Sequence, residues 1–159
     1  MLIGVPVPML MADRTVVRRL RHRSLLDHFS ELVRGSTAGG RLQQRIEAQQ
    51  AQVFVTVITA QETFEGWFAL INRQKAGIAQ TSAYAQFLKS LETLVKFAIL
   101  PFDEDAARVF ERLQERRIRI GRMDLKLASI CLAHEATLLT RNVVDFSKVP
   151  DLQVDNWLV

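Results

Sequence analysis

The sequence predicts an α/β fold in which helices cover both faces of a parallel sheet. Strand-like and helix-like segments alternate along the chain, and this alternation requires crossover connections between parallel strands. The clearest strand is 53–58, VFVTVI, an almost uninterrupted β-branched run typical of a central strand covered on both faces. With 159 residues, 48% of them hydrophobic and 24% charged, the chain fits one domain with a substantial core.

The first 23 residues differ from the rest, and we expect residues 1–23 to form a basic extension that is poorly ordered or loosely docked. Residues 1–12 are apolar but too short for a transmembrane helix, and two prolines interrupt them. Five arginines follow this apolar run, whereas a secretory signal carries its positive charge before it. Cys131 is the only cysteine, which fits a reducing compartment. We therefore predict no membrane association, a cytoplasmic location and a folded domain over residues 24–159.

The folded domain is expected to open with a short buried strand at residues 24–26. Asp27 follows this strand and leads into a helical segment, 28–34, which Gly35 ends. A second amphipathic stretch is expected after the glycine pair at 39–40. Both segments precede the central strand.

A helix is predicted directly after the central strand. Its apolar residues recur at the i, i+3, i+4, i+7 spacing of one helical face: Phe64, Trp67, Phe68 and Ile71. Thr59 and Glu62 fit the capping box, in which a Glu three residues after the cap accepts a hydrogen bond from the cap N–H. From these residues alone, Glu62 is interpreted as a capping residue.

After Gly77, a further helix is predicted to turn a set of apolar residues inward: Tyr84, Phe87, Leu88, Leu91 and Val95. Residues 97–100 then indicate a second buried strand. The following helix starts with the acidic run 103–105 and ends with arginines, an order that matches the helix dipole. We interpret Asp103 and Asp105 as capping residues.

The apolar stretch after Gly121 contains the strongest site candidates. Asp124 falls in the first turn of a helix with almost no polar face, which predicts burial. A buried carboxylate needs a partner or a cation, and the alternative is that Asp124 merely caps the helix. A strand at 136–140 follows, with Asn142 and Asp145 just beyond it, and a short edge strand closes the chain.

In an open parallel sheet, ligands collect beyond the carboxyl ends of the strands. Asp27, Glu62 and the pair of Asn142 and Asp145 each follow a predicted strand, and Asp124 can join them from its helix start. Oxygen ligands without a His or Cys cluster suit Mg²⁺ or Mn²⁺ rather than Zn²⁺. The net charge of +4 also suits a polyanionic partner such as RNA.

Five blocks of the sequence carry recognisable motifs: LDHFSEL at 26–32, ITAQE at 58–62, LPFD at 100–103, GRMDL at 121–125 and TLLTRNVVDF at 137–146. Together they resemble PIN domains of the VapC toxin type, from about residue 25 to the C-terminus. The resemblance implies a three-layer α/β/α fold in which three or four acids hold Mg²⁺ or Mn²⁺ and cleave RNA, with tRNA or rRNA as the expected substrate. It also implies a cognate antitoxin that blocks the site, and a homodimer.

The resemblance assigns roles residue by residue. Glu62 and Asp124 match the second and third family acids. Asp145, with Asn142 as a neutral oxygen donor, occupies the fourth region. The implied catalytic residues are therefore Asp27, Glu62, Asp124 and Asp145, and the implied metal ligands are Asp27, Asp124 and Asn142.

The first acid is where the sequence departs from the family. Family members read Leu-Asp-Thr-Asp-His or Leu-Asp-Thr-Asn at the end of the opening strand, whereas Leu26-Asp27-His28 lacks two residues. Either Asp27 is the first acid, or the metal-binding Asp is replaced by Leu25, with Asp13 as a third option. The alternative function is therefore a catalytically impaired copy that only binds antitoxin or RNA.

Overall fold

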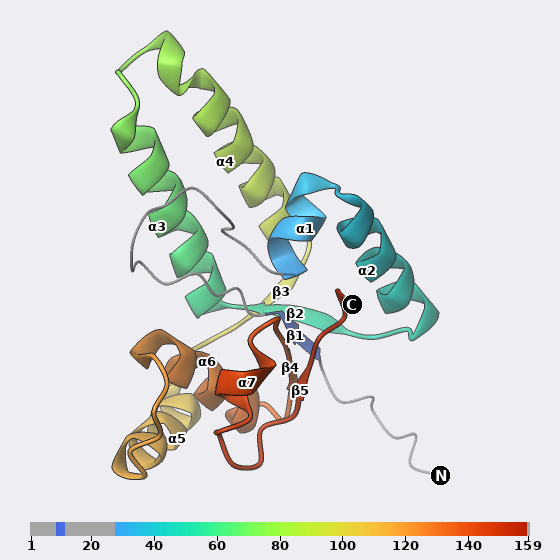
Figure 1. Ribbon diagram of the computed structural model, residues 1–159, viewed down its shortest axis with the longest axis vertical. Helices are drawn as coiled ribbons and strands as arrows, with labels where there is room; N and C mark the ends of the chain where they lie inside the picture. The colour runs from blue at the N-terminus through green and yellow to red at the C-terminus, as the bar shows by residue number, and fades with distance from the viewer. Residues whose placement is uncertain (1–8, 12–27, 159) are drawn as a thin grey trace.

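The computed structural model describes residues 9–11 and 28–158 of the chain. Within these residues the strands form one five-stranded parallel sheet in the order β3-β2-β1-β4-β5 (Figure 1). The strands are β1 (Met9–Met11), β2 (Val53–Thr56), β3 (Ala98–Leu100), β4 (Thr137–Leu139) and β5 (Val154–Asp155). Because every pairing is parallel, all the carboxyl ends lie at one edge of the sheet. The predicted α/β fold is confirmed.

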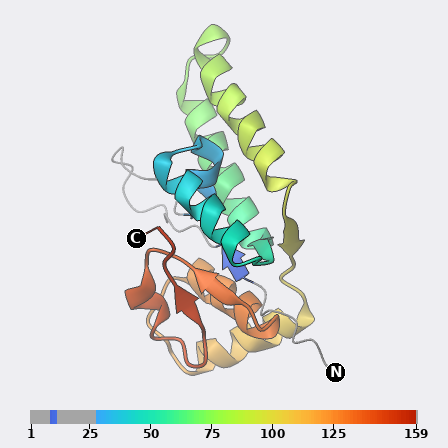
Figure 2. The same cartoon turned by 90° about the vertical axis from the view of Figure 1, so that its right-hand side faces the viewer.

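Two hydrophobic cores lie on opposite faces of this sheet. The helices are α1 (His28–Arg34), α2 (Thr37–Ala48), α3 (Val57–Arg73), η1 (Ile78–Gln80), α4 (Thr81–Leu94), α5 (Glu104–Glu115), α6 (Arg122–Ala133) and α7 (Val143–Phe146). Successive residues of a strand point to opposite faces, so Leu139 packs with α1, α2 and α4, while Leu138 packs with α5 and α6. Figures 1 and 2 show the two helical layers above and below the sheet.

The central strand comes from the stretch for which we expected only a basic extension. β1 pairs with β2 on one side and with β4 on the other, so Met9–Met11 joins the two halves of the sheet. Three apolar residues are too few for a periodic pattern to identify as a strand. The strand expected at 24–26 lies outside the described residues, as do Asp27 and Asp13.

A glycine and a serine separate α1 from α2. Gly35 ends α1 with a φ of +63°, as the sequence predicts, because glycine adopts this conformation without strain. The Ser36 hydroxyl then caps α2 by accepting a hydrogen bond from the N–H of Gly39 at 3.0 Å. The helix therefore begins before the glycine pair and not after it. It runs so close to α1 that a Cβ on Gly39 would lie 2.1 Å from the carbonyl oxygen of Glu31.

The start of α3 also differs from the prediction. The side chain of Thr56 accepts a hydrogen bond from the N–H of Thr59 at 3.0 Å, and this cap ends β2 and begins α3 at Val57. The β-branched residues 57 and 58 are therefore helical, because a cap and tertiary packing outweigh strand propensity. Since Thr56 and not Thr59 is the cap, Glu62 does not occupy the capping-box position. The interpretation of Glu62 as a helix cap is wrong.

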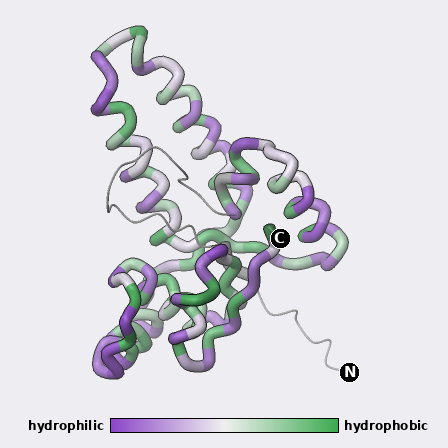
Figure 3. Tube along the Cα trace, viewed as in Figure 1, coloured by the Kyte–Doolittle hydropathy of each residue, from purple (hydrophilic) through white to green (hydrophobic). Residues whose placement is uncertain are grey.

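α3 and α4 form a hairpin that projects away from the sheet (Figures 1 and 2). As predicted, Phe87 of α4 turns inward, and its ring packs against Phe64 and Phe68 with centroids 5.7 and 5.5 Å apart. Three residues predicted to face inward are instead exposed: Tyr84 (53%), Leu88 (55%) and Val95 (78%). Figure 3 shows hydrophobic segments far out along this hairpin. The described part of the chain leaves this face of α4 uncovered because the hairpin extends past the sheet.

The helices of the other layer agree with the sequence except at the end of α5, which stops at Glu115, so the arginines predicted in its last turn follow the helix. Asp103 caps α5 by accepting a hydrogen bond from the N–H of Ala106 at 3.0 Å, which confirms its capping role. α6 is buried over most of its surface, and Leu127 and Cys131 at its centre are fully shielded from solvent. Among the described residues, no helix combines the length and apolar character needed to cross a membrane.

Candidate active site

The elements that carry Glu62, Asp124 and Asn142 meet at the carboxyl edge of the sheet. α3, which carries Glu62, starts directly after β2, and Asn142 follows β4. Asp124 comes from the first turn of α6, and α6 contacts α3. Asp27 and Asp13, the two candidates for the first acid, lie outside the described residues.

Glu62 lies on the face of α3 that packs toward α6. Ile58, one helical turn earlier on the same face, belongs to a core cluster with Leu125 and Ala128 of α6. The Glu62 side chain is half-buried, and its Oε2 atom is shielded from solvent. A carboxylate held in this position requires hydrogen bonds or positive charge to remain ionised.

Asp124 is the third residue of α6 and is fully buried, including both carboxylate oxygens. The N-terminal end of the helix dipole stabilises a carboxylate by about 0.3–1 kcal/mol. Removing a charge from water costs several kcal/mol, so the dipole alone does not offset the burial of an ionised Asp124. An ionised Asp124 therefore needs more stabilisation than the helix dipole gives to an ordinary carboxylate in a first turn.

Asp145 and Asn142 contact each other beyond β4. Asn142 begins α7, and its side-chain Nδ2 donates to Oδ2 of Asp145 at 2.9 Å. The other carboxylate oxygen of Asp145 accepts from the ammonium group of Lys148. Both oxygens of Asp145 are therefore engaged in local contacts that stabilise the turn around α7.

The donor chemistry fits a hard divalent cation, because Glu62, Asp124 and Asn142 all offer oxygen. Within residues 9–11 and 28–158, no three His, Cys, Asp or Glu side chains lie close enough together to hold a metal ion.

The sequence reasoning missed Glu31, an acid of α1 that faces the end of β4. Its Oε1 lies 3.6 Å from Nη2 of Arg141, and its Oε2 accepts a hydrogen bond from the hydroxyl of Ser36. The two charged residues are far apart in the sequence, so no local pattern could have predicted the pair.

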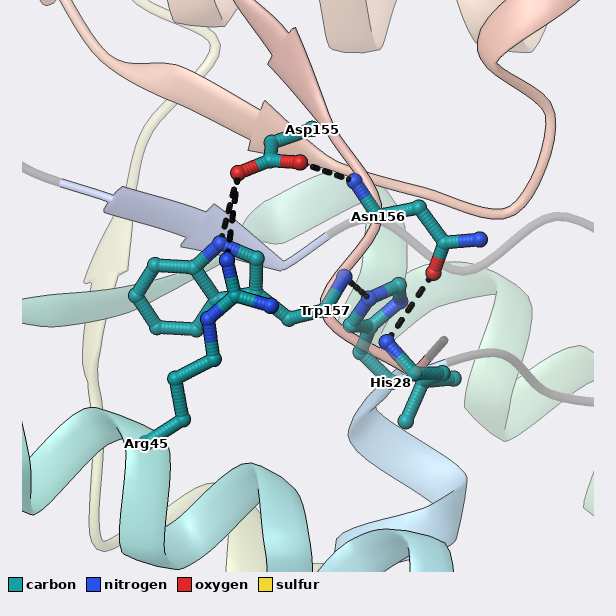
Figure 4. Close-up of polar contacts among 6 residues, drawn as sticks. His28, Arg45, Asp155, Asn156 and Trp157 are labelled. Atoms are coloured by element: carbon teal, nitrogen blue, oxygen red, sulfur yellow. Dashed lines mark hydrogen bonds and ion pairs between the residues drawn. The ribbon is translucent and has the colours of Figure 1, made fainter.

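His28 lies beside this pair and is fully buried. Its Nε2 accepts a hydrogen bond from the backbone N–H of Trp157 at 3.0 Å, while the Trp157 indole donates to Asp155 at 2.7 Å (Figure 4). Arg45 lies over the indole ring, 4.6 Å from its centroid. Burial, and next the positive charge of Arg141, lower the pKa of His28 to about 4. The imidazole is therefore neutral at physiological pH.

Comparison with known proteins decides the family. The family model described as PIN domain matches residues 28–152, most of the chain. The chain belongs to the PIN-domain family. This PIN domain begins its match at α1, so the matched region does not include β1.

Relatives of this PIN domain carry VapC names, and the resemblance to VapC-type proteins is confirmed. A ribonuclease VapC from Rickettsia bellii is 29% identical over 118 residues, which cover 72% of this chain and 84% of the relative.

Solved structures show the same fold. VapBC-1 from nontypeable Haemophilus influenzae has a TM-score of 0.65 at 21% identity and covers 96% of this chain and 99% of its own. A toxin–antitoxin complex from Klebsiella pneumoniae has a TM-score of 0.53 at 19% identity, covering 81% of this chain and 92% of its own.

Proposed function

We propose that this PIN domain is a metal-dependent endoribonuclease, the toxin component of a type II toxin–antitoxin pair, which hydrolyses phosphodiester bonds of tRNA or rRNA. The observation that carries the proposal is the PIN-domain match over residues 28–152 together with relatives named as VapC ribonucleases. The buried Asp124 and the inward-facing Glu62 support it, because both acids stand at the edge of the sheet where ligands collect.

The proposed ligand is Mg²⁺ or Mn²⁺, held by Asp124 and Asn142 with one acid from outside the described residues, while Glu62 and Asp145 complete the catalytic group. When bound, such a cation polarises a phosphate oxygen and lowers the pKa of a bound water. For the first acid, Asp27 remains a candidate. The position of β1 favours Asp13, since this residue follows the end of the central strand by two positions.

A cognate antitoxin and a second copy of the chain are the proposed protein partners. The toxin–antitoxin complexes of similar fold suggest the first. Apolar residues on one side of α4 support the second. Tyr84, Leu88 and the C-cap residue Val95 are exposed, and Leu91 between them is half-buried. The four positions recur at intervals of four, three and four. This spacing reads the same in both directions. Two antiparallel copies of α4 would therefore set Tyr84 against Val95 and Leu88 against Leu91 across a two-fold axis.

The alternative is an impaired copy that binds antitoxin or RNA without cleaving it. The departure of the opening motif favours this alternative, as does the family match that starts only at residue 28. One measurement, the turnover of RNA, distinguishes the two functions.

Incubation of the purified protein with tRNA and rRNA fragments and Mg²⁺ or Mn²⁺ tests the proposal. We expect cleavage that chelation abolishes, loss of cleavage in Asp124→Asn, and normal cleavage in the matched control Asp151→Asn, an exposed acid of the loop before β5. Asp13→Asn and Asp27→Asn, compared side by side, identify the first acid. RNA or antitoxin binding without cleavage by the wild type would establish the impaired copy instead.

A further inference from the structure

Arg141 occupies a fixed position at the carboxyl edge of the sheet. On one side of it, the backbone N–H of Thr140 donates to the carbonyl oxygen of Asp155 at 2.9 Å. On the other side, the N–H of Asn142 donates to the hydroxyl of Thr140 at 3.1 Å. Hydrogen bonds on both sides of Arg141 hold its backbone at the end of β4.

The guanidinium group of Arg141 is held from the side of α1. Glu31 is only 12% exposed at its side chain, whereas Arg141 is 42% exposed. The hydroxyl of Ser36 donates to Glu31 and also caps α2, so Glu31 is fixed between two helices. The largely buried acid therefore restrains an arginine whose side chain partly reaches solvent.

The distance between the two groups decides what this contact can do. Charge-assisted N–H···O hydrogen bonds are about 2.7–2.9 Å long, and the Glu31–Arg141 separation of 3.6 Å exceeds this range. At this separation Glu31 orients the guanidinium mainly through charge. Arginine has five N–H donors in a planar fork, so it can face Glu31 and still present donors to a phosphate.

The site of the proposed reaction lies within reach of the same RNA strand. One strand, β1, separates β4 from β2, so the ends of β2 and β4 are about 10 Å apart at a spacing of about 4.8 Å per strand. α3, which carries Glu62, starts at the end of β2, and Arg141 lies just past the end of β4. A single strand that enters the site at Glu62 and Asp124 can therefore also contact Arg141.

We propose that Arg141 binds a backbone phosphate of the RNA next to the phosphate that is cleaved, and that Glu31 is a positioning residue that holds its guanidinium at the edge of the sheet. This inference rests on the proposed ribonuclease function. A purely structural ion pair is the competing interpretation, and a partly exposed pair of this kind would change folding stability but not the dependence of RNA binding on salt.

The test measures RNA binding separately from cleavage. Binding of a labelled single-stranded RNA is titrated at several salt concentrations in the Asp124→Asn background, in which cleavage is expected to be blocked. Arg141→Ala is expected to weaken binding about tenfold, the loss of one charged contact, and to reduce the slope of log K against log salt by about 0.7. Arg73→Ala, which removes an exposed arginine at the end of α3, is the matched control and is expected to leave both quantities near the parent values.

Two further variants separate positioning from folding. Arg141→Lys keeps the charge but loses the fork, so the salt slope is expected to stay while affinity falls. Glu31→Gln is expected to raise KM for RNA in the otherwise wild-type protein with little change in kcat. Thermal unfolding of each variant confirms that it is folded, and Arg141→Lys replaces Arg141→Ala if the latter does not fold.

Each outcome decides a different claim. Equal affinity and slope in Arg141→Ala and Arg73→Ala would overturn the role of Arg141. A Glu31→Gln variant that is less stable but has an unchanged KM would overturn the role of Glu31. Cleavage that persists in Asp124→Asn would instead contradict the proposed catalytic site, while the salt slopes would still report on Arg141.

Discussion

The backbone N–H of Trp157 donates to Nε2 of His28 at 3.0 Å, across 129 positions of sequence. Because Nε2 accepts, it carries the lone pair, and the proton of the neutral ring resides on Nδ1. The first residue of α1 is thereby tied to the segment after β5 (Figure 4). Arg45, stacked on the Trp157 ring, joins α2 to the same segment.

The first prediction concerns the pH dependence of folding. The pKa of His28 is lowered from 6.5 to about 4 in the folded protein, so the unfolded chain takes up the proton first as the pH falls. This contribution to stability is complete above pH 6.5 and is lost progressively between pH 6.5 and 4, by up to about 3 kcal/mol. Urea unfolding at a series of pH values measures this loss. His28→Gln, which keeps an acceptor for Trp157, should flatten the profile, and an unchanged slope would assign the effect to other groups.

The second prediction uses two adjacent glycines of α2. A Cβ on Gly39 would lie 2.1 Å from the carbonyl oxygen of Glu31, whereas a Cβ on Gly40 meets nothing within 4 Å. Gly39→Ala should therefore destabilise the protein by about 1–3 kcal/mol as α1 and α2 are forced apart. Gly40→Ala should stabilise it by about 1 kcal/mol, because alanine is the better helix former. Chemical denaturation of both variants checks the prediction, and equal effects would show that the two helices do not approach so closely.

The third prediction concerns the cation. A ligand that binds only the folded state at about 100 times its Kd adds about 2.7 kcal/mol of stability, so Mg²⁺ or Mn²⁺ should raise the Tm of the wild type by several degrees. Asp124→Asn should abolish this increase. Calorimetry with and without cation provides the measurement; an identical increase in wild type and variant would exclude Asp124 as a ligand.

The fourth prediction concerns the exposed face of α4. Leu88→Glu places a charge near the centre of the proposed two-fold contact and should convert a dimer into a monomer. Ser82→Glu, an exposed position on another side of the same helix, is the control and should leave the mass unchanged. Sedimentation or light scattering over a range of concentrations reports the mass. A wild-type protein that is monomeric throughout would contradict the proposed homodimer.

Local patterns predicted much of this fold, and long-range contacts account for the rest. The apolar runs of β2 and β4, the cap at Asp103 and the buried helix of Asp124 all follow from short stretches of sequence. β3 forms where its apolar run predicts a strand, but its predicted burial is wrong, because it is an edge strand and Ile99 is 46% exposed. β1 could not be predicted because three residues carry no periodicity, and its neighbours β2 and β4 are distant in sequence. The inward orientation of Tyr84, Leu88 and Val95 was wrong for a different reason. An amphipathic pattern identifies the apolar face of a helix, but it does not show whether the same chain packs against that face.

In the candidate site, too, some residues follow from local motifs and others depend on long-range contacts. The acids Glu62 and Asp124 were predicted from motifs, and their roles stay predictions. The capping interpretation of Glu62 failed because Thr56 begins the helix earlier. The Glu31–Arg141 pair depends on how α1 crosses the end of β4, and no spacing within either segment encodes that crossing.

The place of β1 has a consequence for truncated forms of the protein. A polypeptide that lacked residues 1–11 would keep every described helix but would lose β1, the strand between β2 and β4. The sheet would then divide into two strand pairs, β3 with β2 and β4 with β5. In each pair, the edge that β1 had covered would have unpaired backbone N–H and C=O groups. Unpaired strand edges pair with strands of other molecules. We therefore expect the truncated protein to aggregate or be degraded rather than accumulate as a smaller folded protein.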